Sequence, residues 1–88
     1  MELNYPIDYT LYNTEEITVI IKFLDLIEEC YLAGVELAEF KSMYKEFKNV
    51  VRAKSEENSL YREFKEITGY DGYLAVKEMK NEKPKIKL

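Results

Sequence analysis

Three pairs of adjacent glutamates have the side-chain type for acid–base chemistry or metal binding: Glu15 with Glu16, Glu28 with Glu29, and Glu56 with Glu57. Paired carboxylates do this work when they face one another across a cleft, often together with a histidine. Neighbouring residues on a helix instead point about 100° apart, and the sequence contains no histidine. We therefore interpret the pairs as charges that complement helix dipoles or face solvent, and we expect no catalytic and no metal-binding residues.

The sequence has a single cysteine, Cys30, so it can form no internal disulfide and no four-cysteine metal site. A lone nucleophilic thiol needs a cationic neighbour, whereas Glu28 and Glu29 precede Cys30. The sequence also lacks a glycine-rich phosphate-binding motif. These observations favour a buried structural cysteine and predict a protein with no cofactor and no enzymatic activity.

Four cations spaced four, three and four residues apart would share one face of a predicted helix: Lys41, Lys45, Lys48 and Arg52. One interpretation is an ordinary solvated face, balanced by acidic residues of the preceding helix. The other is a docking face for an acidic partner, either a protein or RNA. Nucleic acid is the less favoured partner because the whole chain is acidic, with a net charge of −4 and a pI of about 4.9.

Tyrosine is abundant, with eight residues, and its ring suits both a thin core and an interface. Tyr31 and Tyr44 fall on apolar stripes, which favours packing. Tyr70 and Tyr73 flank a predicted turn at residues 69–72 and are better candidates for an interaction surface, although packing remains the alternative there as well.

Charge is unevenly distributed along the 88 residues. Residues 1–39 hold nine acidic residues and one lysine, whereas residues 40–88 hold twelve basic and eight acidic residues. A chain of this length forms one domain with a thin core, so self-association as a homodimer would add useful burial. The first residues lack the features of a secretory signal, and the most apolar stretch is too short to span a membrane. We expect a cytoplasmic protein.

The first predicted helix begins at a capping box formed by Asn13 and Glu16 and ends at Gly34. Its apolar residues recur with helical spacing over residues 17–31. A second helix over about residues 36–52 carries a seam for antiparallel packing, made of Leu37, Phe40, Tyr44, Phe47 and Val51.

A third helix is predicted to begin after Ser55 as its N-cap and to end at Gly69, with a buried stripe of Leu60, Phe64 and Ile67. Asp71 would cap a short fourth helix that includes Tyr73, Val76 and Met79. The predicted fold is therefore all-α, a compact helical bundle of three main helices plus a short fourth C-terminal helix. Residues 1–80 would form one domain with an extended N-terminal strap at residues 1–12, and residues 81–88 a flexible basic tail.

The order of several short segments resembles the YktA-like family of small uncharacterised proteins from low-GC Gram-positive bacteria. The segments are Tyr5-Pro6-Ile7, Thr14-Glu15-Glu16-Ile17, Phe47-Lys48, Lys54-Ser55-Glu56-Glu57, Glu63-Phe64 and Thr68-Gly69-Tyr70-Asp71-Gly72-Tyr73. The resemblance covers about residues 5–79, and it departs from the family where Tyr12 and Asn13 occupy the place of a typical tryptophan. It implies a cytosolic helical bundle and supplies no catalytic or binding residues.

We expect a non-catalytic protein-interaction module, whose partner is another protein or a second copy of the chain. The missing catalytic side chains, the small core and the segregated charge all favour this hypothesis. One alternative is a nucleic-acid-associated accessory protein that uses the basic face of the second helix. Another is an enzyme subunit completed by a partner.

Overall fold

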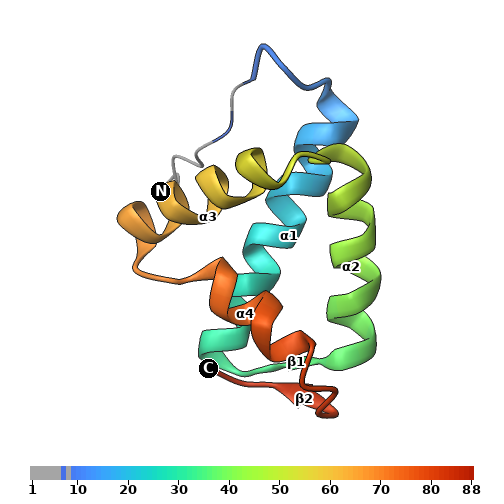
Figure 1. The fold of residues 1–88 in the computed structure, drawn as a ribbon, viewed down its shortest axis with the longest axis vertical. Coiled ribbons are helices and arrows are strands. Elements are labelled where there is room, and N and C mark those ends of the chain that lie inside the picture. Colours follow the sequence, from blue (N-terminus) through green and yellow to red (C-terminus); the bar gives the residue numbers. More distant parts are fainter. Residues whose placement is uncertain (1–6, 8) are drawn as a thin grey trace.

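A computed structural model describes residue 7 and residues 9–88. Its elements follow one another along the chain as α1 (Thr14–Leu32), β1 (Val35–Glu36), α2 (Leu37–Val50), α3 (Lys54–Thr68), α4 (Gly72–Met79) and β2 (Lys85–Ile86). Helices dominate this part of the chain and pack around a shared apolar core, with a two-stranded ladder at one end (Figure 1). The prediction of an all-α bundle is confirmed.

Helix α1 begins and ends where the sequence predicts. The Asn13 side chain accepts a hydrogen bond from the Glu16 N–H, and the Glu16 side chain accepts one from the Asn13 N–H, which completes the capping box. After the helix, Gly34 adopts a φ of 93°, and its N–H donates to the carbonyl of Glu29. Only glycine adopts this left-handed conformation without strain, so Gly34 fixes where the chain leaves α1.

Helices α1 and α2 run antiparallel and form the main layer of the core (Figure 1). The Phe23 ring of α1 stacks on Phe47 of α2 at 4.4 Å between centroids and lies 5.4 Å from Phe40. All three phenylalanines are fully buried. The antiparallel seam predicted for the second helix is therefore present.

Helix α3 departs from the prediction in two places. It begins at Lys54, with Ala53 as an N-cap that makes no side-chain hydrogen bond, so Ser55 is not the cap. Leu60 and Phe64 are buried as predicted, but Ile67 is 49% exposed. Figure 1 shows the reason, since α3 runs across α1 and its C-terminal end extends away from the α1/α2 pair.

The turn between α3 and α4 matches the prediction. Gly69 ends α3 with a φ of 85°, and the Asp71 side chain caps α4 by accepting from the N–H groups of Tyr73 and Leu74. The Tyr31 hydroxyl of α1 accepts a hydrogen bond from the Asp71 N–H at 3.0 Å. The turn is thus tied to the C-terminal end of α1.

Residues 81–88 do not form the predicted flexible tail. In β2, Ile86 pairs with Val35 and Lys85 with Glu36, in antiparallel register. The Ile86 side chain is 1% exposed, and the Leu88 N–H donates to the carbonyl of Cys30. Ile86 fills the end of the core beside β1, so burial of its apolar side chain holds this segment in place. The many lysines of the segment give no sign of this contact in the sequence.

The predicted strap at residues 1–12 falls largely outside the described residues, since residues 1–6 and 8 are not described. Of the rest, Ile7 is buried, whereas Tyr9 and Leu11 are exposed. Tyr12 packs against the core, and its hydroxyl donates to Glu56 of α3.

Candidate functional site

The most unusual side chain in the described part of the chain is Glu57, a glutamate of α3 that is fully buried. Its carboxylate accepts a hydrogen bond from the Lys48 ammonium at 2.7 Å. It also accepts from the hydroxyls of Tyr61 at 2.6 Å and Tyr44 at 3.0 Å. We call these four residues the Glu57 cluster, and it joins α2 to α3.

Burial would raise the pKa of Glu57, but the hydrogen bonds from Lys48, Tyr61 and Tyr44 and the Lys48 charge outweigh it and lower that pKa. The same contacts act oppositely on the phenols. Burial first, and then the Glu57 carboxylate, raise the pKa of Tyr44 to about 12 and raise the pKa of Tyr61 further. At neutral pH the Glu57 side chain therefore stays ionised and both tyrosine hydroxyls stay protonated. Such a fixed protonation pattern suits a structural link between the two helices.

Sequence reasoning missed this cluster, because it interpreted Glu56 and Glu57 together as helix-dipole charges. A signal was present in the spacing. Tyr44 and Lys48 lie four residues apart on α2, and Glu57 and Tyr61 lie four residues apart on α3. Each pair therefore occupies one helix face, and the two faces meet.

The four cations predicted to share one helix face separate into different environments, and Arg52 lies beyond the end of α2. Lys48 belongs to the Glu57 cluster, Lys41 pairs with Glu82 of the C-terminal segment, and the Arg52 side chain donates to the carbonyl of Asn49. Lys45 is exposed and has no hydrogen bond or ion pair to any described residue. The acidic residues that balance this face thus come from α3 and the C-terminal segment, whereas the sequence analysis placed them on α1.

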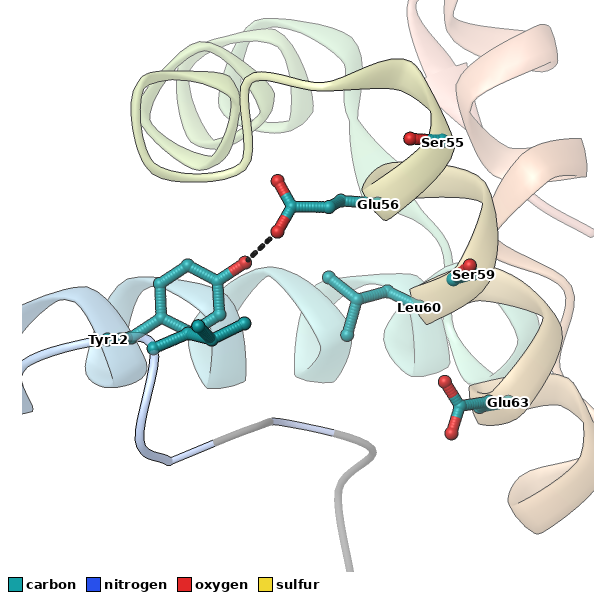
Figure 2. Close-up of a pocket in the computed structure, with 7 residues that line it drawn as sticks. Tyr12, Ser55, Glu56, Ser59, Leu60 and Glu63 are labelled. Carbon is teal, nitrogen blue, oxygen red and sulfur yellow. Dashed lines mark hydrogen bonds between the residues drawn. The ribbon is translucent and has the colours of Figure 1, made fainter.

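Helix α3 is flanked by two hollows. The first, of about 250 Å³, lies between α3 and the segment that precedes α1 (Figure 2). Figure 2 shows Glu56 and Glu63 extending from α3 toward the side on which Tyr12 lies. Leu11 and Leu60 supply apolar surface there. This hollow is acidic, and we call it the acidic hollow.

The second hollow has a volume of about 320 Å³ and lies between α3 and the α3–α4 turn. Its lining combines cations, an amide, a carboxylate and two aromatic rings: Asn58, Tyr61, Arg62, Lys65, Asp71 and Tyr73. We call it the Arg62 hollow. It includes Tyr73, one of the two predicted tyrosines, which is 54% exposed. The other, Tyr70, lies against the Tyr31 ring with centroids 4.9 Å apart and is partly buried.

The sequence pattern of an uncharacterised protein family, UPF0223, matches residues 2–87. The chain belongs to UPF0223. It is similar to UPF0223 proteins of Listeria welshimeri, at 42% identity over 92% of this chain and 89% of the relative, and of Staphylococcus aureus, at 39% over 91% and 87%. A relative from Oceanobacillus iheyensis is 41% identical over 89% of this chain and 88% of its own length. These organisms are low-GC Gram-positive bacteria, the group that the resemblance implied.

Cys30 of this UPF0223 protein is buried in the core, as predicted. Burial, reinforced by the Glu29 charge, raises the pKa of its thiol to about 12, which keeps the sulfur protonated. Among the described residues, no cluster of three or more histidine, cysteine, aspartate or glutamate side chains could hold a metal ion. Within the same residues, no helix is both long and apolar enough to span a membrane.

Proposed function

We propose that this UPF0223 protein is a small, non-catalytic, cytoplasmic interaction module whose protein partner docks on α3 and the α3–α4 turn. The observation that carries this proposal is the pair of hollows of opposite charge on either side of one helix. Exposed apolar side chains accompany both, with Leu11 beside the acidic hollow and Tyr73 beside the Arg62 hollow. Tyrosine and arginine are enriched among the residues that dominate protein interfaces.

The C-terminal end of α3 adds to this surface. Ile67 is 49% exposed, and Leu74, three residues after the Asp71 cap of α4, is 43% exposed. Covering these side chains with a partner would add apolar burial to a chain whose own core is thin. A second copy of the chain is one such partner.

Nucleic acid is less well supported as a partner. Two of the four cations predicted to share one face, Lys41 and Lys48, already pair with carboxylates of the same chain. A polyanion would have to displace Glu57 and Glu82 to reach them, and the net charge of −4 repels it at longer range.

Photo-crosslinking in the host bacterium tests the proposal. A photoreactive phenylalanine analogue placed at Tyr73, Ile67 or Leu11 should join the chain to a specific protein, or to a second copy of itself. The same analogue at Lys45, which is exposed on α2 and lines neither hollow, is the matched control. Crosslinks that form only from position 45, or from none of the four positions, would overturn the proposal.

A further inference from the structure

We propose that the Arg62 hollow binds an acidic peptide segment of the partner protein, with a carboxylate on the Arg62 guanidinium and an apolar side chain against Tyr73. This inference rests on the proposed function and names the chemistry of the partner at one of its two hollows. Four features of the hollow support it: its unused positive charge, its rigid aromatic wall, its anchored turn and its size.

The charge of the hollow is only partly balanced from within the chain. Asp71, the one carboxylate in the lining, is fully engaged: one oxygen caps α4 by accepting from the Tyr73 and Leu74 N–H groups, and the other lies 3.5 Å from the Lys65 ammonium. Arg62 has no hydrogen bond or ion pair to any described residue. A guanidinium remains charged at all physiological pH values and presents paired donors that match a carboxylate, so the hollow is complementary to an anion.

The aromatic wall is rigid. Tyr61 is 4% exposed, its ring stacks on Phe47 with centroids 6.2 Å apart, and its hydroxyl donates to Glu57 at 2.6 Å. The α3–α4 turn presses against this ring at Gly72, where an added Cβ would lie 2.6 Å from a Tyr61 ring carbon. A preformed wall loses little conformational freedom when a ligand side chain packs on it.

The opposite side of the hollow is also held in place. The Asp71 N–H donates to the Tyr31 hydroxyl, and the Tyr70 ring packs on the Tyr31 ring. The turn that precedes Tyr73 is therefore anchored to α1 on one side and ion-paired to α3 through Lys65 on the other. Arg62 and Tyr73 consequently stand on two elements whose separation is fixed.

The size of the hollow favours a peptide side chain over a larger ligand. About 320 Å³ lies at the low end of the range of roughly 300–1,000 Å³ for small-molecule pockets. Such a space accommodates one apolar side chain with an adjacent carboxylate. An RNA strand needs several cations along its backbone, whereas this lining has two, one of which already pairs with Asp71.

The test begins with selection of phage-displayed random dodecapeptides on the purified full chain. Enriched peptides should carry Asp or Glu next to an aromatic or aliphatic residue. Fluorescence polarisation of the labelled peptide should show affinity reduced about tenfold or more by Arg62→Glu, since a hydrogen-bonded charge is lost, and weakened by salt. Tyr73→Ala should also weaken binding, whereas Lys45→Glu, which removes an exposed cation outside the hollow, should not.

Circular dichroism checks that the variants fold, and Arg62→Gln, which removes the charge alone, serves if Arg62→Glu is unstable. A selection that enriches no peptide, peptides without acidic residues, or affinity insensitive to both Arg62 variants would overturn the inference. Binding of an oligoribonucleotide through Arg62 that displaces the peptide would overturn it in favour of RNA. If crosslinking from Tyr73 captures a partner while these peptide results are negative, the proposed function stands and this inference alone fails.

Discussion

The Lys48 ammonium of α2 lies 2.7 Å from the Glu57 carboxylate of α3, forming an ion pair in which the glutamate side chain is 1% exposed and the lysine side chain 27% exposed. A buried carboxylate without compensation is strongly unfavourable. Lys48 supplies the compensating charge, and the hydroxyls of Tyr44 and Tyr61 supply the remaining hydrogen bonds. Lys48 is thus the nearest cation to the buried carboxylate and the one that reaches it from the other helix, since Lys54 of α3 itself lies farther away, at 4.0 Å.

Replacing Lys48 with methionine tests the contribution of its charge, because methionine matches the unbranched lysine side chain as far as the ε carbon and lacks the ammonium group. Breaking a fully buried pair costs about 3–5 kcal/mol. Since Lys48 is partly exposed, we expect a loss of about 2–3 kcal/mol in the free energy of unfolding, measured by urea unfolding at pH 7. Lys45→Met on the exposed side of α2 should change it by less than about 0.5 kcal/mol. Equal effects of the two substitutions would contradict the conclusion that Lys48 compensates the buried charge of Glu57.

The Glu57 carboxylate also predicts a pH dependence of stability. Its pKa in the folded protein lies below the ordinary value of 4.5, so the unfolded state binds the proton more readily. The stabilising contribution is then fully present above about pH 4.5 and is lost as the pH falls through the lower native pKa. The stability difference between the wild type and Glu57→Gln should accordingly be largest near neutral pH and shrink on acidification.

Urea unfolding of both proteins between neutral and strongly acidic pH measures this difference. The same comparison in a Lys48→Met background is the control, because removing the ammonium removes one cause of the lowered pKa. The pH dependence should be smaller in that background. A difference between wild type and Glu57→Gln that stays constant with pH would show that Glu57 does not titrate as described.

The local parts of the fold could be predicted from the sequence, because they depend on residues close together in the chain. The capping box of Asn13 and Glu16 and the Asp71 cap each involve contacts over three residues, and both are present. The apolar spacing of α1 and α2 likewise identified the main helix pair, since its phenylalanines recur at helical intervals.

The parts that sequence analysis missed depend on contacts between distant segments. Ile86 is buried because β2 pairs with β1, about 50 residues earlier, and no periodicity in so short a segment reports this pairing. Glu57 is buried because α3 crosses the bundle with that face inward, and the local apolar spacing of α3 does not reveal this packing angle. The separation of Lys41 from Lys48 follows from the same two features, since Lys48 pairs with Glu57 of α3 and Lys41 with Glu82 of the C-terminal segment.

Gly72 is predicted to be required for the packing of the α3–α4 turn on Tyr61. An added Cβ would lie 2.6 Å from a Tyr61 ring carbon and 2.9 Å from the Ile27 side chain. Both side chains are buried and have little room to move, so Gly72→Ala should cost about 1–3 kcal/mol by overpacking. Thermal unfolding measures this loss.

Gly69→Ala is the matched comparison for Gly72→Ala. Gly69 has a φ of 85° but nothing within 4 Å of an added Cβ, so its substitution should cost about 1 kcal/mol from backbone strain alone. Because the Gly72 clash borders the Arg62 hollow, Gly72→Ala should also disturb peptide binding there, and Gly69→Ala should disturb it less. If Gly72→Ala leaves the melting temperature unchanged, the Tyr61 ring can move to accommodate the added methyl group and the prediction is wrong.

Ile86 provides the clearest test of how the C-terminal segment is held. If residues 81–88 were a flexible tail, Ile86→Ala would leave stability unchanged. Because the Ile86 side chain is 1% exposed and belongs to the core, we expect the substitution to lower the free energy of unfolding by about 2–4 kcal/mol, the usual cost of truncating a buried isoleucine. Lys83→Ala, on an exposed residue of the same segment, should change it by less than about 0.5 kcal/mol. Hydrogen exchange gives an independent readout, since the amides of Leu37 and Leu88 donate to Pro84 and Cys30 and should exchange slowly in the wild type and faster in Ile86→Ala.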